Sequence, residues 1–383
     1  MAAPSSSTKS TSSVHDIADD KPAFGSRFLT DSDDVWSQNA WDHVSPPTDQ
    51  AERIQESLER QRKGRIAAEE TRRYHEKPSR NWDEFYKSNE ANFFKDRKWL
   101  HNEFPELVAA AQSDAGQKTI VELGCGAGNS IFPVLTSNQN PDLRLHAFDY
   151  ASHAVKLVQR NPLYTSPPLG TINSAVWDLS SSSLPPGIEP GSVDLVVMVF
   201  VLSALHPDEW AQALKNVHTM LKPGGKVLFR DYGRHDLTQL RFKAGRLLDV
   251  ENFYIRGDKT RVYFFELDEL ALLFTGSHAT KEQTSVVESV ERDPAEVGDG
   301  LADTTMHTPG PGTPSLESPN PSSTPAPPSL SPEPSNTITS HLTRFPSGQF
   351  TVDSIGVDRR LIVNRKRQIK MYRVWMQGKF IRV

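Results

Sequence analysis

This chain of 383 residues has almost no cysteine and no long apolar stretch. Its one cysteine, Cys125, excludes an internal disulfide and is typical of a reducing compartment. No run of about 18 apolar residues occurs, so we expect no membrane span. The first residues, MAAPSSSTKSTSS, lack the apolar core of a secretory signal, and Asp16, Asp19 and Asp20 argue against an organelle transit peptide. These absences predict a cytoplasmic protein.

Acidic residues are missing from the C-terminal end. The net charge is −5, but residues 281–340 hold two basic and nine acidic residues, a net −7, which leaves +2 for the rest. After Asp358 no acid follows, whereas nine basic residues do: Arg359, Arg360, Arg365, Lys366, Arg367, Lys370, Arg373, Lys379 and Arg382. Such a basic end favours an anionic partner, which the overall charge conceals.

Two segments have too few apolar residues to form a core. Residues 1–21 are predicted to be disordered, as are residues 276–345, which hold 11 of the 28 prolines among many serines and threonines. Residues 22–118 have helical propensity and mixed charge, so they are predicted to form a helical extension. Because strand patterns resume after the proline-rich tract, we interpret that tract as an insertion inside one domain.

Strands and helices alternate from residue 119 onward. Strands are predicted over 119–123, 143–149, 171–178, 192–201 and 226–231, and helices over 130–138, 152–160, 207–221 and 267–274. Further strands over 350–364 and 368–380 place residues 346–383 in the same core as 119–275. The alternation predicts an α/β, Rossmann-like fold with helices on both faces of the sheet. We expect seven strands, mostly parallel, with an antiparallel final strand.

A glycine-rich turn follows the first predicted strand. After Glu122 come Gly124, Gly126 and Gly128, where the backbone can turn tightly and approach a ligand. A dinucleotide fingerprint needs its third glycine at the position of Asn129. The spacing found here is typical of enzymes that use S-adenosyl-L-methionine, which has no pyrophosphate to cradle.

Acidic residues end the second and third predicted strands. Asp149 can accept hydrogen bonds from both ribose hydroxyls of a nucleoside cofactor. Asp178 can accept from an adenine amino group, while the backbone N–H of Leu179 can donate to a ring nitrogen. Either acid alone is more typical of a cap or turn. Together with the glycine turn they predict S-adenosyl-L-methionine binding and the class I methyltransferase form of the fold, with no metal site.

Longer strings go beyond this generic fold. They are FGSRFL (24–29), NAWDHV (39–44), NWDEFYKSNEANFFKDRKWL (81–100), VFVLSALHP (199–207), TMLKPGGKVLFRDYGRHDLTQLRF (219–242), NFYIRGDKTRVYFF (252–265) and DRRLIVNRKRQIKMYRVWMQGKF (358–380). Together they resemble the family of tRNA N(3)-methylcytidine methyltransferases, and the first two resemble its threonine-tRNA branch. The resemblance implies formation of 3-methylcytidine at position 32 of the anticodon loop of tRNA(Thr), and in some members of other tRNAs. The proline-rich insertion is the departure from the family pattern.

The resemblance also implies which residues contact the cofactor: Trp82, Tyr86, Gly124, Asp149, Asp178, Leu179 and Val199. The spacing of four between Trp82 and Tyr86 places both rings on one face of a helix. Core packing of that helix is the alternative interpretation. Through these residues the extension would contact both cofactor and tRNA. An aminoacyl-tRNA synthetase or an accessory tRNA-binding protein is a further candidate partner, although we recognise no sequence motif that would bind such a protein.

Methylation of cytosine N3 requires no proton removal, because N3 carries a neutral lone pair, and the product ring is cationic. We therefore expect in-line placement, a dry pocket and negative potential near the base. The ends of the fourth and fifth strands hold Phe200 for stacking and Asp231 and Tyr232 around the base. Asp231 is the predicted catalytic residue; an ion pair with Arg230 or Arg234 is the alternative. The candidates for holding phosphates are Arg234, Arg241 and Arg256.

Aromatic residues lie among the basic residues of the C-terminal end. Tyr372, Trp375 and Phe380 suit the stacking by which single-stranded loop bases are read. An edge strand with solubilising charge is the alternative.

Two other functions stay open from sequence alone. A methyltransferase of this fold can act on a protein or a small molecule, but the Asn/Asp-Pro-Pro-Phe/Tyr motif frequent in protein N-methylators is replaced here by VFVLSAL (199–205). A non-enzymatic interaction module can keep the fold as a scaffold, but the intact glycine turn argues against a decayed site.

Overall fold

The computed structural model describes residues 29–280 and 348–383, apart from 31, 43, 45–49 and 98. The segments predicted to be disordered, 1–21 and all but the first five residues of 276–345, lie outside the described residues. The described residues stop shortly after helix α11 (Leu267–Thr275) and resume just before strand β9 (Phe350–Asn364). These two points adjoin, because the backbone N–H of Gly348 donates to the carbonyl of Thr275 (3.2 Å).

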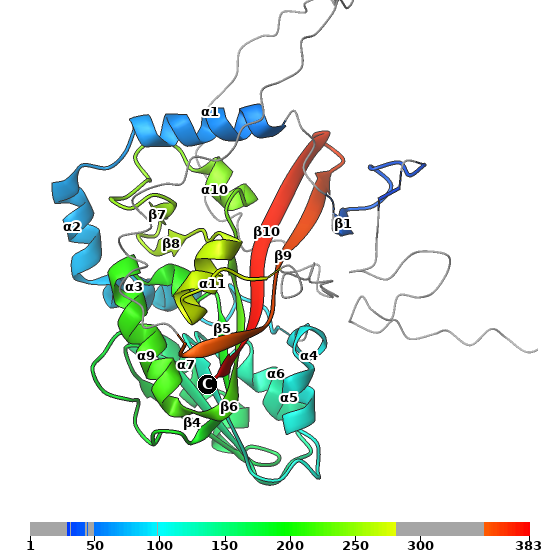
Figure 1. Cartoon of the computed structure of the whole chain (residues 1–383), viewed down its shortest axis with the longest axis vertical. Helices are drawn as coiled ribbons and strands as arrows, with labels where there is room; N and C mark the ends of the chain where they lie inside the picture. Colours follow the sequence, from blue (N-terminus) through cyan, green and yellow to red (C-terminus); the bar gives the residue numbers. More distant parts are fainter. Residues whose placement is uncertain (1–28, 31, 43, 45–49, 98, 281–347) are drawn as a thin grey trace, which may run out of the picture.

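An eight-stranded sheet forms the centre of the molecule, in the order β1-β9-β10-β6-β5-β2-β3-β4 (Figure 1). Its other strands are β1 (Ala40–Asp42), β2 (Lys118–Leu123), β3 (Leu143–Asp149), β4 (Thr171–Val176), β5 (Val193–Val199), β6 (Leu221–Tyr232) and β10 (Ile369–Arg382). Strands β2 to β6 pair in parallel, whereas β10 runs antiparallel to both β6 and β9. Seven strands with an antiparallel final strand confirm the predicted Rossmann-like fold. The eighth, β1, pairs antiparallel with β9 and was not predicted.

Alternating side chains of each central strand enter two separate cores. In β5, Leu195, Val197 and Val199 pack on the side of α4 (Leu100–Glu103), α5 (Pro105–Ala110) and α6 (Ile131–Thr136). Val196 and Met198 pack on the opposite side with α9 (Trp210–Met220) and α11. This period of two, in strands that are apolar on both faces, produces the helix–sheet–helix layers seen in Figure 1. No described helix has the length and apolar composition needed to span a bilayer.

Helices of the N-terminal extension are α1 (Gln50–Lys63), α2 (Ala68–Glu76) and α3 (Pro78–Asn89). Helix α3 is fixed beside α7 (Ser152–Arg160) by Asp83, whose carboxylate accepts hydrogen bonds from the backbone N–H of His153 (2.7 Å) and the hydroxyl of Ser152 (3.1 Å). A carboxylate at a helix N-terminus satisfies otherwise unpaired N–H groups. This contact places α3 over the carboxyl ends of the strands.

Helix α1 lies against α10 (Leu237–Arg241), which follows β6. The buried Gln61 side-chain amide donates to the carbonyls of Gln239 (2.9 Å) and Phe242 (3.0 Å), and the Ser57 hydroxyl donates to the carbonyl of Leu240 (2.8 Å). A small second sheet, β7 (Phe253–Ile255) with β8 (Arg261–Tyr263), adjoins this region. The remaining short elements are α8 (Pro162–Thr165) and the 3₁₀ helices η2 (Leu202–Ala204) and η3 (Pro207–Glu209).

The C-terminal aromatic residues point into the protein. Tyr372, Trp375 and Phe380 are 6%, 5% and 0% exposed, so the prediction that they stack on RNA is wrong. The reason is that β10 lies between β6 and β9 and is covered on both faces, which also excludes the edge-strand alternative.

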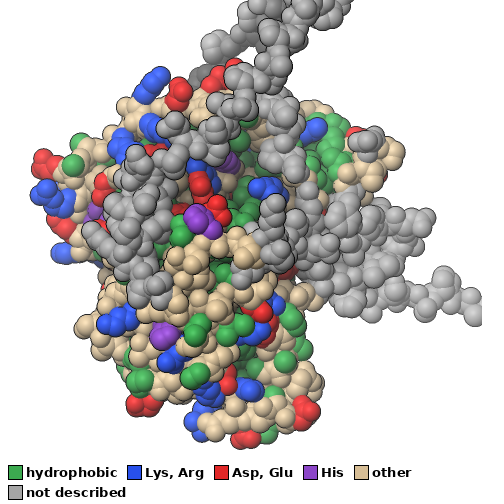
Figure 2. Space-filling view, in the orientation of Figure 1, with side chains coloured by type: hydrophobic (Ala, Val, Ile, Leu, Met, Phe, Trp, Pro, Cys, Tyr) green, Lys and Arg blue, Asp and Glu red, His purple; other side chains and the backbone are tan. Residues whose placement is uncertain are grey.

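Buried ion pairs also engage some of the nine C-terminal basic residues. The Nε atom of Arg360 lies 2.8 Å from an Asp42 carboxylate oxygen on β1, and that of Arg373 lies 2.9 Å from Asp236. Basic residues that stay exposed gather where β9 turns into β10, namely Arg365, Lys366, Arg367 and Lys370. Over the face seen in Figure 2, coloured basic and acidic side chains are interspersed.

Candidate functional site

A pocket opens at the carboxyl ends of the parallel strands. It lies beside β2, the strand whose two neighbours in the sheet are β3 and β5, where the strand order reverses. It encloses about 950 Å³ including its open mouth. The residues predicted to contact the cofactor all line it: Trp82, Tyr86, Gly124, Asp149, Asp178, Leu179 and Val199. Tertiary structure therefore brings the extension and four strand ends to one cavity.

The glycine turn adjoins this pocket, which Gly124 lines. Gly124, Gly126 and Gly128 have φ angles of +58°, +53° and +87°, a region that L side chains rarely adopt. A Cβ atom on Gly124 would also stand 2.7 Å from a methyl group of Val201. Cys125, between two of these glycines, is buried, and burial raises the pKa of its thiol well above the usual value. A thiol in that state is a packing residue and not a nucleophile.

Asp149 joins the turn to the end of β3. Its two carboxylate oxygens accept hydrogen bonds from the backbone N–H groups of Gly126 (2.9 Å) and Ala151 (2.8 Å). Burial raises the pKa of Asp149 to about 6, against the lowering effect of these two bonds. Each oxygen can accept a second hydrogen bond, so the carboxylate can hold the loop and still receive a ligand hydroxyl.

Helix α3 covers the pocket with two aromatic rings. Trp82 and Tyr86 share one face, with ring centroids 6.2 Å apart and an interplanar angle of 28°. Tyr86 is 5% exposed and packs with Phe85 and Ala151, whereas Trp82 is half-buried. Tyr86 therefore packs in the core as the alternative interpretation expects, but it lines the cavity as well. Trp82 also lines the cavity.

The end of β4 presents one exposed acid to the pocket. One oxygen of the Asp178 carboxylate accepts from the backbone N–H (2.8 Å) and the hydroxyl (2.7 Å) of Ser180. The preceding residue is anchored because the N–H of Trp177 donates to the carbonyl of Asp149 (3.0 Å). Asp178 and Asp149 thus lie on adjacent strand ends, as recognition of one nucleoside requires.

A nucleoside cofactor fits this set of donors and acceptors. Besides the two carboxylates, the pocket holds the hydroxyl of Tyr150, which is buried and has no hydrogen-bond partner in the described part of the chain. A buried hydroxyl without a partner, in a residue that lines a cavity, can be satisfied by a polar ligand atom. The apolar walls from Leu179 and Val199 suit the faces of a purine ring.

The opposite wall carries an aromatic pair. Phe200 has φ +60°, although it is not glycine, and its N–H donates to the carbonyl of Arg230 (2.8 Å). Its ring centroid lies 4.7 Å from that of Tyr232. The guanidinium of Arg97 lies 5.6 Å from the Phe200 ring, and that of Arg256 lies 5.3 Å from the Tyr232 ring. Strained backbone of this kind is typical of functional sites.

Asp231 lies directly behind this wall. It is fully buried and is absent from the residues that line the pocket. Its carboxylate accepts from the backbone N–H groups of Ser203 (2.9 Å) and Tyr232 (2.8 Å), both of which line the pocket. Burial raises the pKa of Asp231 to about 6. Within the described residues Arg230 pairs with Asp358 and Arg234 with Glu266, so the ion-pair alternative for Asp231 is wrong.

Arginines at the pocket differ from the set predicted. Of the three candidates for phosphates only Arg256 lines it; Arg234 is paired with Glu266. Arg97 and Arg261 line the pocket but were not predicted. Both lie in strings quoted above for their resemblance, 81–100 and 252–265, but residue type and spacing assigned a role to neither. Arg261 is placed by a hydrogen bond to the carbonyl of Ala204 (3.1 Å).

Comparison with known proteins agrees with this geometry. Residues 121–227 match the family described as a methyltransferase domain. The Saccharomyces cerevisiae protein named tRNA(Thr) (cytosine(32)-N(3))-methyltransferase is 42% identical over 359 residues, which are 93% of this chain and 45% of that protein. This chain thus spans about half the length of that relative.

Other relatives match over nearly their whole length. The Schizosaccharomyces pombe protein named tRNA N(3)-methylcytidine methyltransferase trm140 is 38% identical over 376 residues, covering 98% of this chain and 97% of that protein. The human tRNA N(3)-cytidine methyltransferase METTL2B is 34% identical over 338 residues, covering 70% of this chain and 88% of that one. The pocket at the strand ends and these matches show that the chain belongs to the family of tRNA N(3)-methylcytidine methyltransferases.

Proposed function

We propose that this chain transfers a methyl group from S-adenosyl-L-methionine to N3 of cytidine 32 in the anticodon loop of tRNA(Thr) and of further tRNAs. One observation carries the proposal: a relative named for 3-methylcytidine formation aligns with 98% of the chain. The gathering of seven predicted contact residues in one pocket supports it. The relatives named above offer no support for a protein or small-molecule substrate.

Cofactor binding is assigned to the strand ends and α3. Asp149 would accept from the ribose hydroxyls and Asp178 from the adenine amino group, with the N–H of Leu179 donating to a ring nitrogen. Trp82 and Tyr86 would cover the cofactor and exclude water. When bound, S-adenosyl-L-methionine supplies a methyl group on a positively charged sulfur, which a neutral nitrogen accepts directly.

The target base is assigned to the wall formed by Phe200 and Tyr232. A flipped pyrimidine can stack on these rings, whose apolar faces line the cavity beside the cofactor residues. Arg256, at the edge of Tyr232, is placed to meet a phosphate of the flanking nucleotides. Because N3 carries no proton, the chain has to supply orientation and a dry site, not a base.

Asp231 is assigned a positioning role in the same reaction. Its carboxylate holds Ser203 and Tyr232 through their backbone N–H groups, so it acts on the base through the wall that it supports. Its negative charge behind that wall would also favour the cationic product. An Asp231→Asn variant that binds cofactor and tRNA normally and methylates at the full rate would remove this role.

The decisive experiment is nucleoside mass spectrometry on tRNA from cells that lack the gene. We expect loss of 3-methylcytidine at position 32, rescue by the wild-type chain and no rescue by Asp149→Ala. A matched variant, Asp142→Ala, changes an exposed acid at the amino end of β3 and should rescue fully. Unchanged 3-methylcytidine in the deletion strain would overturn the proposal.

Compartment and partners follow from the same substrate. We propose that the chain works in the cytoplasm and that an aminoacyl-tRNA synthetase or an accessory tRNA-binding protein presents the tRNA. The scarcity of cysteine supports a reducing compartment. Fluorescence localisation tests the first statement, and co-purification with and without ribonuclease tests the second.

A further inference from the structure

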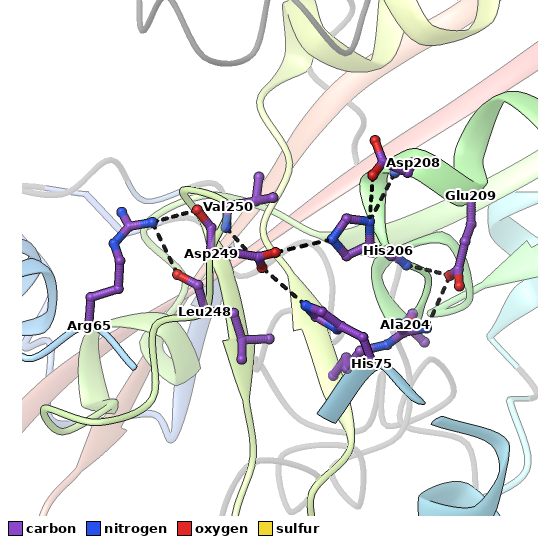
Figure 3. Close-up of polar contacts among 10 residues, drawn as sticks. Arg65, His75, Ala204, His206, Asp208, Glu209, Leu248, Asp249 and Val250 are labelled. Carbon is purple, nitrogen blue, oxygen red and sulfur yellow. Dashed lines mark hydrogen bonds and ion pairs between the residues drawn. The ribbon is translucent and has the colours of Figure 1, made fainter. Parts of the chain in front are cut away.

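Three side chains from separate parts of the chain converge beside the pocket (Figure 3). His75 comes from the last turn of α2, His206 from the link between η2 and η3, and Asp249 from the loop before β7. Each offers one ligand atom, and these atoms all lie within 4.8 Å of one another. None of the three lines the cofactor pocket, so the cluster is separate from the site described above.

Two distances within the cluster are close to those that a shared ion requires, and the widest pair, at up to 4.8 Å, would draw together on binding. Nε2 of His75 lies 3.1 Å from one carboxylate oxygen of Asp249, and Nε2 of His206 lies 3.6 Å from the other. Ligands about 2.0 to 2.2 Å from a tetrahedral ion stand roughly 3.3 to 3.6 Å apart. Two imidazoles and one carboxylate favour a borderline cation of the Zn²⁺ class over Mg²⁺ or Ca²⁺, which prefer oxygen ligands.

A carboxylate stands behind one of the imidazoles. Nδ1 of His206 accepts from the backbone N–H of Asp208 (3.2 Å) and lies 3.5 Å from an Asp208 carboxylate oxygen. As the ring stands, Nδ1 is an acceptor, so an ion on Nε2 would require the ring proton to move to Nδ1. The bond from the Asp208 N–H would then be given up, and Nδ1 would donate to the Asp208 carboxylate instead. That exchange would produce the carboxylate–histidine–metal arrangement that usually supports a metal ligand.

The ligand side chains are held in place by their surroundings. The His75 ring is stacked on Phe253 (centroids 5.8 Å apart, 10° between planes), and the His206 ring meets Phe253 edge-on at 5.5 Å. The guanidinium of Arg65 donates to the carbonyls of Leu248 (3.1 Å) and Asp249 (2.7 Å), which fixes the loop that carries the carboxylate (Figure 3). Such support pre-organises a site before the ion arrives.

Asp249 leaves room for a further ligand. Its side chain is 42% exposed, so a water molecule could complete a set of four ligands.

We propose that His75, His206 and Asp249 form a structural site for a divalent transition metal of the Zn²⁺ class. The ion would join two walls of the cofactor pocket. His75 is three residues before Pro78, where α3 begins, and His206 follows directly on Leu205; both Pro78 and Leu205 line the pocket. A bound ion would hold α3, with its covering rings, against the segment after β5. It would thereby increase affinity for the cofactor without touching it.

The first test measures metal content on tag-free protein. The chain is incubated with Zn²⁺, desalted and assayed by inductively coupled plasma mass spectrometry. It should retain about one Zn²⁺ ion per chain. His75→Gln and His206→Gln should each lose it. His278→Gln, which changes an exposed histidine outside the cluster, should retain it. Retention of less than about a tenth of an equivalent by the wild type would overturn the proposal.

The second test uses only the wild-type chain, so it does not depend on how the variants fold. Co²⁺ added to the metal-free protein should produce the visible absorption bands of a four-coordinate site, and Zn²⁺ should bleach them. Zn²⁺ but not Mg²⁺ should raise the melting temperature and tighten binding of S-adenosylhomocysteine by several-fold. If Co²⁺ gives no bands and Zn²⁺ moves neither quantity, the cluster is a hydrogen-bonded latch between an acid and two imidazoles, and the metal site is refuted.

Discussion

The hydroxyl of Tyr86 occupies the place where a Cβ atom on Gly126 would stand. Helix α3 and the glycine turn are therefore packed without a gap, side chain against bare backbone. Residue 126 has φ +53°, so glycine is required there for two reasons, conformation and space. These two effects can be separated by mutation.

Gly126→Ala should abolish cofactor binding, because the new methyl group displaces Tyr86 from the pocket wall. Gly116→Ala is the matched control: its φ is +67°, but nothing lies within 4 Å of its Cβ position. Both variants should lose about 1 to 2 kcal/mol of unfolding free energy from the left-handed conformation. Only Gly126→Ala should lose S-adenosylhomocysteine binding in calorimetry. Equal binding by the two variants would contradict the close packing.

Cofactor affinity should fall at acid pH through Asp149. Burial raises the pKa of this carboxyl to about 6 in the free protein, so below that pH it holds a proton that must leave before it can accept two ribose hydroxyls. Affinity for S-adenosylhomocysteine should therefore decrease by up to about tenfold for each pH unit below 6. Above 6 it should be flat.

Two variants check the origin of that slope. Asp149→Asn should bind weakly, with the slope below pH 6 removed. Asp178→Asn should also bind more weakly, but it should keep the wild-type slope because Asp149 is intact. A wild-type affinity that does not change across pH 6, measured by calorimetry, would show that Asp149 does not receive the ribose.

Removal of the Phe200 ring should impair methylation more than cofactor binding. Phe200→Ala keeps a non-glycine residue at φ +60°, so the backbone strain is the same and only the ring is lost. Stacking of a base is worth about 1 to 3 kcal/mol, which predicts a loss of roughly 5- to 150-fold in kcat/KM for an anticodon-arm RNA. Phe200→Tyr should stay near wild type. If Phe200→Ala methylates the RNA as fast as Phe200→Tyr and the wild type, the target base does not stack on Phe200.

Breaking the Arg230–Asp358 pair should destabilise the sheet. The two groups are each 1% exposed with N and O 2.6 Å apart, and the guanidinium lies 4.8 Å from the rings of both Trp99 and Trp375. Asp358→Asn removes the counter-charge from a buried cation, which costs about 3 to 5 kcal/mol of unfolding free energy. Urea unfolding measures the free energy of unfolding of Arg230→Met, of Asp358→Leu and of the double variant. The double variant should lose less free energy of unfolding than the sum of the losses in these two single variants. Additive losses would contradict a coupled pair.

The exposed turn between β9 and β10 should contribute to tRNA affinity through charge. Neutralising Lys366 and Arg367 with glutamine should weaken binding and reduce the slope of log affinity against log salt by about 2. Arg144→Gln with Lys215→Gln, an equal charge change at exposed positions on β3 and α9, should leave the slope unaltered. Filter binding over a salt series measures both. A reduced slope for both pairs would point to a general effect of net charge.

Sequence alone was sufficient for the parallel sheet, because strands buried on both faces are apolar throughout and the helices between them begin and end at clear signals. It was also sufficient for the glycine turn, Asp149 and Asp178, since residues at the carboxyl ends of parallel strands must meet at one edge of the sheet. The alternation of strands and helices fixes that meeting before any contact is known.

Tertiary structure decided the orientation of side chains whose sequence pattern allows two answers. The aromatic and basic pattern around Tyr372 and Trp375 predicts an exposed strand. The position of β10 between two other strands buries both side chains instead. Asp231 follows the sheet pattern into the interior, so it reaches the pocket only through the backbone it supports. The cluster of His75, His206 and Asp249 is set by how α2, the segment after β5 and the loop before β7 pack together, and distances between remote segments have no local sequence signal.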